Sequence, residues 1–122
     1  PKSLIPKYIE SLGVTISSDL MQTLKWCDAV NMLRVQNERM DLNYFPSNRE
    51  YAQLYGLNAK KLASLKKEII LLHPGPINRG VEITSDVADS KNAIILDQVE
   101  NGVAVRMAII YLLVAKLNVS SK

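Results

Sequence analysis

A short apolar run at residues 69–72, Ile-Ile-Leu-Leu, stops at the turn His73-Pro74-Gly75-Pro76. Aliphatic and β-branched side chains in a run of this length, followed by Pro and Gly, predict a buried β-strand. In open sheets of parallel strands, ligands bind where the carboxyl ends of the strands meet the loops that follow them. The sequence therefore predicts a buried parallel strand over 69–72 and a candidate ligand site at the turn.

The turn itself is poor in hydrogen-bond donors. Pro74 and Pro76 have no backbone N–H, and the ring of each holds φ at about −65°, so the segment mainly presents carbonyl acceptors. Gly75 between them lets a ligand approach the backbone closely. Such a turn suits a ligand that donates hydrogen bonds, for example an amide or carbamoyl NH2 group. On the turn alone, a rigid connection that binds no ligand is an equally good interpretation.

A second strand is predicted over residues 29–33, and it runs directly into a polar cluster at 34–39. If the chain stays extended past the strand, Arg34, Gln36 and Glu38 project to one side. A guanidinium binds a carboxylate through two parallel hydrogen bonds, which an ammonium group cannot reproduce. Arg34 and Gln36 at the end of a buried strand are therefore candidates for holding a carboxylate.

Apolar residues at helical spacing predict helices over residues 4–12, 18–27, 58–67 and 96–117. Gly13 ends the first of them, and Ser18-Asp19 opens the second. The last helix continues through Asn101-Gly102, although this dipeptide also fits a hairpin turn. We expect that helix to be covered on most of its circumference and to be too short to span a membrane.

The remaining segments carry weaker signals. Residues 14–17 favour a short strand, and the polar and aromatic stretch 41–68 predicts a mobile loop with a short helix on each side. Residues 81–91 are too polar and too β-branched to be assigned. The lysines at 60, 61, 66 and 67 predict a solvated helix face, with attraction of anionic substrates as the alternative.

Composition excludes several functional classes. The net charge of +3 is scattered, and 6% of the residues are aromatic, so no nucleic-acid surface is indicated. Cys27 is the single cysteine and His73 the single histidine, which leaves neither a disulfide nor a metal-ligand spacing. The chain starts with Pro1 and carries no signal peptide, so we expect a cytoplasmic protein without a membrane partner. Its length of 122 residues predicts at most one domain.

Three blocks together resemble a known family. They are LRVQNER at 33–39, HPGPINRGVE at 73–82 and NGVAVRMA at 101–108. Their order and spacing closely resemble the catalytic chain of aspartate carbamoyltransferase, whose C-terminal, aspartate-binding domain aligns with essentially all 122 residues. The sister family, ornithine carbamoyltransferase, carries a cysteine-containing turn in place of residues 73–76, which argues against it.

The resemblance implies an α/β fold with a doubly wound, Rossmann-like parallel sheet and flanking helices, present here only in part. Residues 1–122 would be the aspartate-binding domain, incomplete at its N-terminal end, with the carbamoyl-phosphate domain absent. The strands at 14–17, 29–33 and 69–72 would be the third, fourth and fifth of a sheet in the order 3-2-1-4-5. We therefore expect a segment of a longer or nicked chain that neither folds fully nor catalyses alone.

The chemistry implied by the resemblance is transfer of the carbamoyl group from carbamoyl phosphate to the amino group of L-aspartate, in pyrimidine biosynthesis, without a cofactor. Arg34 would hold a carboxylate of aspartate, with Gln36 beside it. The carbonyls of Pro74, Gly75 and Pro76 would accept hydrogen bonds from the carbamoyl NH2 group. No side chain is assigned as catalytic.

Two further residues would act behind these groups. Glu38 would orient Arg34 or Arg39, although a surface ion pair explains it equally well. His73 would be structural. The resemblance also implies the remainder of the catalytic chain as a partner, and assembly into a homotrimer that some members join to regulatory chains.

Two other functional classes remain open at the level of sequence. One is a non-catalytic, carbamoyltransferase-like assembly module. The other is a nucleotide-binding α/β module, which the missing G-x-G-x-x-G fingerprint disfavours.

Overall fold

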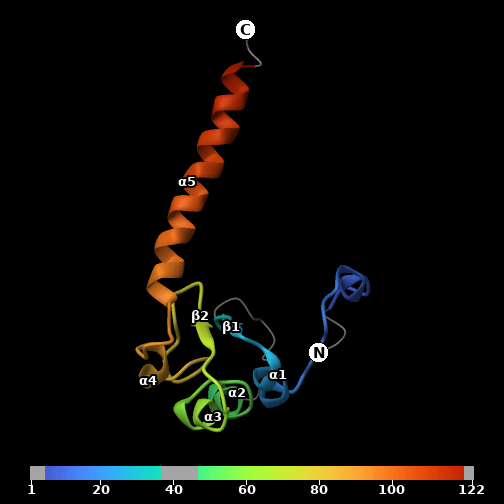
Figure 1. Cartoon of the computed structure of the whole chain (residues 1–122), viewed down its shortest axis with the longest axis vertical. Helices are drawn as coiled ribbons and strands as arrows, with labels where there is room; N and C mark the ends of the chain where they lie inside the picture. Colours follow the sequence, from blue (N-terminus) through green and yellow to red (C-terminus); the bar gives the residue numbers. More distant parts are fainter. Residues whose placement is uncertain (1–4, 37–46, 120–122) are drawn as a thin grey trace.

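The computed structural model describes residues 5–36 and 47–119, and side chains as far as residue 115. In chain order the elements are the 3-10 helix η2 (Ile9–Leu12), α1 (Leu20–Trp26), β1 (Ala29–Asn31), α2 (Asn48–Leu54), α3 (Ala59–Ala63), β2 (Ile70–Leu72), α4 (Ser85–Ala88) and α5 (Ile95–Val119). The helices α1 to α4 gather around the two strands, and α5 rises away from them (Figure 1).

The strands β1 and β2 form a parallel two-stranded sheet. The registered pairs are Ala29 with Ile70, Val30 with Leu71, and Asn31 with Leu72. One residue past β1, the N–H of Met32 donates to the carbonyl of Leu72 at 2.9 Å. The strand predicted over 69–72 is confirmed at residues 70–72, and the strand predicted over 29–33 is confirmed at residues 29–31. The α/β class with a parallel sheet and flanking helices is thus present in part, as expected.

Residues 14–17 do not form the predicted third strand. A strand needs a neighbour to pair its N–H and C=O groups, and within the described part of the chain the sheet offers these residues none. The same shortage of neighbours affects β1, which is exposed at Ala29 and Asn31 and half-buried at Val30. The prediction that β1 is a buried strand is therefore wrong. In β2, Leu71 is fully buried while Ile70 is largely exposed.

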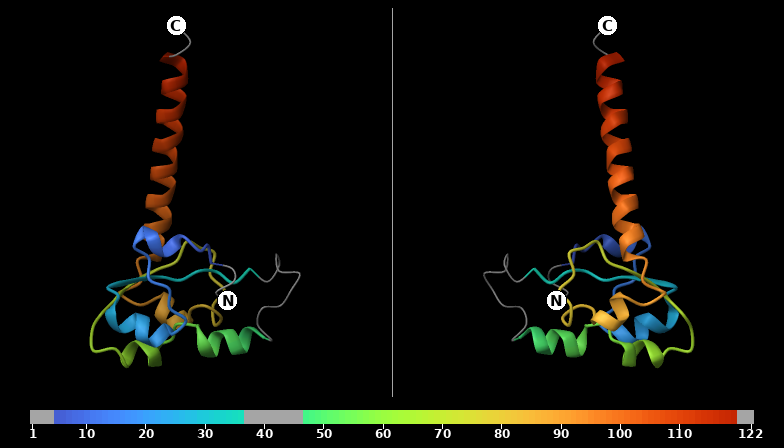
Figure 2. Two further views of the ribbon diagram at one scale, coloured as in Figure 1. Left: turned by 90° about the vertical axis from the view of Figure 1, so that its right-hand side faces the viewer. Right: turned by 90° about the vertical axis from the view of Figure 1, so that its left-hand side faces the viewer.

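One cluster of buried apolar side chains forms the core between β2 and the short helices. Its members are Leu24, Met32, Leu57, Leu65, Ile69, Leu71, Ile83, Val87 and Ile95. Full burial of each aliphatic side chain contributes roughly 1.5–3 kcal/mol. The cluster joins α1, β2, α4 and the start of α5 into one body, which the two side views show below α5 (Figure 2).

The predicted helices are confirmed to different extents. Helix α1 begins as expected, because the side chain of Asp19 accepts a hydrogen bond from the N–H of Gln22 at 2.9 Å. Helix α3 starts at Ala59 but ends at Ala63, four residues before the predicted end. Of the helix predicted over 4–12, the described residues retain one 3-10 turn, η2, which ends at Gly13 with φ 81°.

The stretch 41–68 contains two short helices, α2 and α3, and its residues 41–46 lie outside the described part. Lys61 does not belong to a solvated face. Its ammonium group donates to the carbonyls of Gln53, Leu54 and Gly56 at 2.9, 3.2 and 2.7 Å, at the end of α2. Burial lowers the pKa of Lys61 below its usual value. Helix α4 falls in the stretch that the sequence leaves unassigned.

Helix α5 is confirmed as a long helix that continues through Asn101-Gly102, but the prediction that it is covered is wrong. From Leu96 to Val114 all of its side chains except the half-buried Gln98 are exposed, including the large apolar Leu96, Met107 and Leu112 at 84%, 66% and 65%. Apolar groups occur on every side of the helix, so its own pattern does not define a single buried face. Helix α5 contacts β2, and Ile95 at its start belongs to the buried core.

The prediction that α5 is too short to span a membrane is also wrong on length and composition. The 21 residues 95–115 contain an 18-residue window with a mean hydropathy of 1.3, and none of that window is buried. The same length and composition occur in helices that pack inside soluble proteins, so they do not identify a membrane segment.

Gly56 allows the backbone to pass close to two other segments. A Cβ at this position would lie 2.5 Å from the carbonyl oxygens of Ala52 and Val81. We expect Gly56→Ala to lower the free energy of unfolding by about 2–3 kcal/mol, because backbone atoms cannot move aside cheaply. The control is Gly13→Ala, where φ is 81° and the space is open, so the cost is only the backbone strain of about 1 kcal/mol. Denaturant titration of both variants, made in a complete chain that contains this segment, measures the difference; equal losses would contradict a steric role for Gly56.

Candidate functional site

The parallel pairing of β1 and β2 brings the segments that follow them to the same edge of the sheet. The side-chain amide of Asn78 donates to the carbonyl of Val35 at 2.9 Å and so joins the loop after β2 to the segment after β1. Arg34 and Val35 are half-buried there, and Gln36 is exposed. Glu38 lies outside the described residues. The structure thus brings the Arg34–Gln36 segment beside the loop that carries the proline turn.

The turn at residues 74–76 lies at the surface, with Pro74 and Pro76 exposed and Gly75 half-buried. The Gly75-Pro76 peptide bond is cis. Gly75 has a φ of 67°, in the left-handed region that favours glycine, and a Cβ there would meet only Val99, at 3.8 Å. Glycine is therefore required by the backbone conformation of the turn.

His73 is fully buried beneath the turn. Its backbone N–H donates to the side-chain oxygen of Gln98 at 2.8 Å, which attaches the turn to the first turns of α5. Its ring Nδ1 accepts a hydrogen bond from the N–H of Gly75 at 2.9 Å. The ring has no exposed surface through which it could contact a ligand.

Glu82 is the second fully buried polar residue of the site. Its Oε1 accepts a hydrogen bond from the N–H of Asn78 at 2.6 Å and lies 3.3 Å from Nε2 of His73. The pKa of Tyr51 on α2 is raised above its usual value, first by burial and then by the charge of Glu82 and by Tyr55. A buried carboxylate thus supports both ends of the loop from His73 to Asn78.

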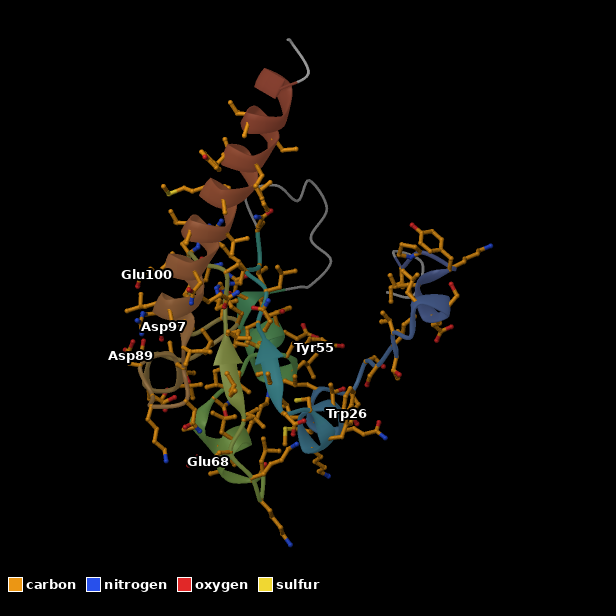
Figure 3. All side chains as sticks on the ribbon, turned by 45° about the horizontal axis from the view of Figure 1, so that its top comes forward. Trp26, Tyr55, Glu68, Asp89, Asp97 and Glu100 are labelled. Atoms are coloured by element: carbon orange, nitrogen blue, oxygen red, sulfur yellow. The ribbon has the colours of Figure 1, made fainter. Side chains whose placement is uncertain are left out.

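The roles of Asn78, Glu82 and Gln98 were not predicted from the sequence. Asn78 and Glu82 lie within the block at 73–82, where an acidic residue that follows a glycine turn offers a weak signal. Gln98 offers none, because its partner lies 25 residues away in the chain. Arg79, in the same block, points elsewhere: its Nη1 and Nη2 each donate to the carboxylate of Asp89 at 2.8 Å. Figure 3 labels Asp89, which lies near the start of α5. This ion pair is exposed, and its hydrogen bonds lower the pKa of Asp89.

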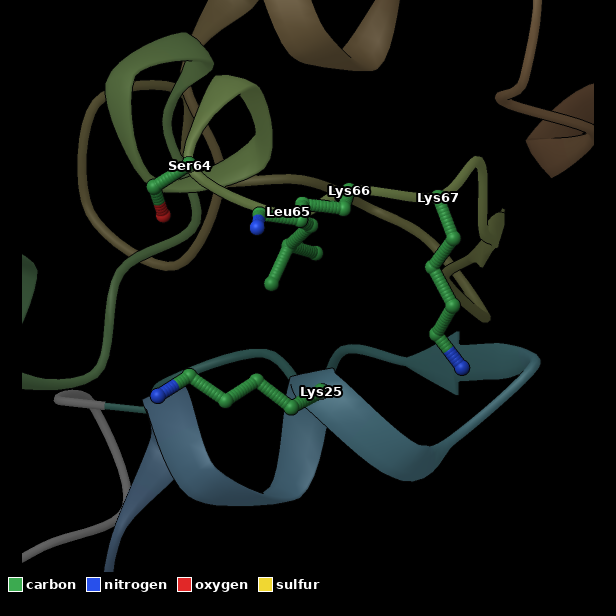
Figure 4. A pocket seen from close by; sticks show the side chains of 5 residues that line it. All are labelled: Lys25, Ser64, Leu65, Lys66 and Lys67. Atoms are coloured by element: carbon green, nitrogen blue, oxygen red, sulfur yellow. The ribbon is translucent and has the colours of Figure 1, made fainter.

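Two cavities lie apart from the turn, one on its side of the sheet and one on the opposite side. One of about 500 Å³ lies between the loop after β2 and the start of α5, lined among others by Ile77, Arg79, Asp89 and Asp97. The other, of about 410 Å³, is lined by Lys25, Ser64, Leu65, Lys66 and Lys67 (Figure 4). The second lies at the amino ends of β1 and β2, opposite to the edge where ligands of parallel sheets bind.

A family model described as the Asp/Orn binding domain of aspartate/ornithine carbamoyltransferase matches residues 6–113. The chain belongs to the aspartate/ornithine carbamoyltransferase family. The family resemblance predicted from residues 33–39, 73–82 and 101–108 is thereby confirmed. The match covers both strand ends and most of α5.

Two curated relatives show which members of the carbamoyltransferase family this segment is similar to. The aspartate carbamoyltransferase catalytic subunit of Christiangramia forsetii is 71% identical over 117 residues, which are 96% of this chain and 38% of the relative. That of Flavobacterium johnsoniae is 68% identical over the same length and shares. The chain therefore spans about 38% of the length of the relatives it matches.

Solved structures agree on the fold. An aspartate transcarbamoylase from Trypanosoma cruzi, in complex with carbamoyl aspartate and phosphate, superposes with a TM-score of 0.65 at 23% identity, over 91% of this chain and 37% of that one. An ornithine carbamoyltransferase from Thermus thermophilus gives 0.61 at 20% identity, over 80% and 31%. At these identities the likeness concerns the carbamoyltransferase fold alone.

The bond between Asn78 and Val35 is the direct link between the two strand ends. We expect Asn78→Ala to lower the free energy of unfolding by about 1 kcal/mol, because it removes one partly buried hydrogen bond, from the side-chain amide to Val35. The hydrogen bond from the backbone N–H of residue 78 to Glu82 remains. Asn31→Ala, an exposed amide at the end of β1, is the matched control and should change stability by less than about 0.5 kcal/mol. Urea titration of both variants, made in a complete chain that contains this segment, tests this; a loss for Asn31→Ala as large as that for Asn78→Ala would remove the linking role.

Proposed function

We propose that this chain supplies the aspartate-binding side of an aspartate carbamoyltransferase. The observation that carries the proposal is the 71% identity to a relative of that name across a segment that includes both strand ends. The bond from Asn78 to Val35 supports it, because it brings a guanidinium-bearing segment next to a donor-poor turn. The two kinds of group suit the two substrates, a dicarboxylate and a carbamoyl compound.

In the proposed reaction, the amino group of L-aspartate attacks the carbonyl carbon of carbamoyl phosphate. A tetrahedral intermediate forms, the C–O bond to phosphate breaks, and the amine loses a proton, giving N-carbamoyl-L-aspartate and inorganic phosphate. Arg34 holds a carboxylate of aspartate through two parallel hydrogen bonds, with Gln36 beside it. The carbonyls of Pro74, Gly75 and Pro76 accept from the carbamoyl NH2 group.

Catalysis in this scheme comes mainly from positioning. Holding two reactants in attack geometry can remove up to roughly 7–11 kcal/mol of barrier in the best intramolecular models. The hydrogen bonds that fix the turn to His73 and to Gln98 serve this purpose, because an error in the position of the carbonyls relative to Arg34 would cost rate as well as affinity. Glu38 would assist by orienting Arg34.

The remainder of a catalytic chain is the proposed partner of α5. The chain spans about 38% of its relatives, and the helix that follows the site exposes apolar groups from Leu96 to Val114. Exposed apolar surface of this extent marks a contact with another protein surface. From the family resemblance we further propose that residues 1–122 belong to the aspartate-binding domain of a chain that also has a separate carbamoyl-phosphate domain. We also propose that complete chains form a cytoplasmic homotrimer.

The role of Arg34 can be tested in a chimeric chain, in which this segment replaces the stretch that it matches in the C. forsetii catalytic subunit. We expect Arg34→Lys to raise the KM for aspartate by about 10- to 100-fold, since a charge-assisted bidentate contact contributes roughly 1.5–3 kcal/mol. The KM for carbamoyl phosphate should change by less than about threefold.

The matched control is Arg49→Lys, at an exposed arginine on α2. It should leave both KM values within about twofold of the unsubstituted chimera. Steady-state kinetics with each substrate varied in turn give the result. An unchanged KM for aspartate in the Arg34 variant would remove Arg34 from the site, and an inactive chimera that binds neither substrate by calorimetry would favour the assembly-module alternative.

The exposure of α5 leads to a separate expectation for the 122-residue chain on its own. We expect it to bind a hydrophobic dye, to self-associate in sedimentation velocity and to form no carbamoylaspartate. Mixing it with the remaining N-terminal part of the C. forsetii subunit should reduce dye binding and restore measurable activity. A monomeric chain that melts cooperatively and forms carbamoylaspartate at the rate of the chimera would contradict the proposal.

A further inference from the structure

The proline turn has a single backbone N–H, and that group is already occupied. Pro74 and Pro76 have none, and the N–H of Gly75 donates to Nδ1 of His73 at 2.9 Å. Among the described residues, no hydrogen bond reaches the carbonyl oxygens of residues 74–76. A ligand that approaches the turn therefore meets hydrogen-bond acceptors and no donor.

The acceptor role of Nδ1 requires a particular tautomer of His73. A ring nitrogen accepts a hydrogen bond only when it carries no proton, so the neutral ring must carry its proton on Nε2. Nε2 lies 3.3 Å from Oε1 of Glu82, and a carboxylate there favours a proton on the nearer nitrogen. Both side chains have no solvent exposure, so water does not compete for these positions.

Glu82 is itself held in place by the loop that it supports. Its Oε1 accepts from the N–H of Asn78 at 2.6 Å, four residues before it in the chain. The carboxylate therefore contacts the loop beyond the turn, while the ring of His73 contacts the turn itself. This arrangement links the orientation of the ring to the shape of the whole loop.

We propose that His73 is a positioning residue that determines the specificity of the turn, because it removes the only donor from a surface that would otherwise present both donors and acceptors. Glu82 sets the tautomer that makes this possible. The inference rests on the proposed function and deepens it: it explains how this chain would select a carbamoyl NH2 group over a group that can only accept hydrogen bonds.

Two substitutions that both introduce an amide group distinguish the effect of the acceptor at Nδ1 from the effect of packing. In His73→Asn, the amide group stands near the position of Nδ1 and can accept from Gly75. In His73→Gln, it stands near the position of Nε2 and cannot. We expect the kcat/KM for carbamoyl phosphate in the chimeric chain to fall by less than about fivefold for Asn and by about 10- to 100-fold for Gln. His73→Leu should resemble Gln.

The melting temperatures of the variants show whether a loss of activity follows from a loss of stability, as a purely structural role of His73 would predict. Gln is closer to His in volume than Asn, so packing alone predicts that the Gln variant is both the more stable and the more active of the two. The proposal predicts instead that Asn is the more active even where it is the less stable. Equal activities, or a more active Gln variant, would overturn it.

The tautomer can be observed without the reaction. With ¹⁵N-labelled histidine, the spectrum of the chimeric chain minus that of its His73→Asn variant isolates the signals of His73. We expect an unprotonated Nδ1 and a protonated Nε2, and we expect Glu82→Gln to change that pattern. A protonated Nδ1 would overturn the role of His73 even in an active chimera. An inactive chimera with the expected tautomer would instead overturn the proposed function on which the role in specificity rests.

Discussion

The parallel pairing of β1 with β2 is the constraint from which the arrangement of the site follows. Because Val30 lies opposite Leu71, the chain leaves both strands at the same edge, and the segments that carry Arg34 and Pro74 begin there side by side. The bond from Asn78 to Val35 then fixes their separation beyond the strands. With an antiparallel register, the two segments would leave the sheet at opposite ends, and no site could form between them.

A buried polar network supports this edge from within. Gln98, His73 and Gly75 are joined by hydrogen bonds, as are Glu82, Asn78 and Val35, and the two sets meet at the 3.3 Å contact between His73 and Glu82. Buried polar groups are costly unless they are paired, so such a network favours one conformation of the loop over others. The network also ties α5 to the turn, which makes the long helix part of the support of the site.

Helix α5 is the element through which the site would meet the proposed remainder of a catalytic chain. Its start is anchored through Gln98 and Ile95, but the rest exposes apolar groups around its circumference. The chain spans about 38% of the length of its family relatives, and the exposure of the helix is in keeping with that share. A helix that supports the turn at one end and meets another surface along its length would transmit the position of that surface to the site.

The sequence by itself determined the features that depend on covalent structure and local periodicity. These are the strand that ends before His73, the cap of α1 at Asp19, the long helix through Gly102 and the lack of donors at the two prolines. Burial and pairing were decided by the tertiary structure alone. Residues 14–17 have the composition of a strand but no partner, Glu82 and Gln98 gain their roles from residues that the fold brings near, and α5 lacks the cover that its pattern predicts. The physical reason is that the conformational preferences of the backbone for helix, strand or turn act within a few residues. Hydrogen-bond pairing and burial depend instead on neighbours that are distant along the chain.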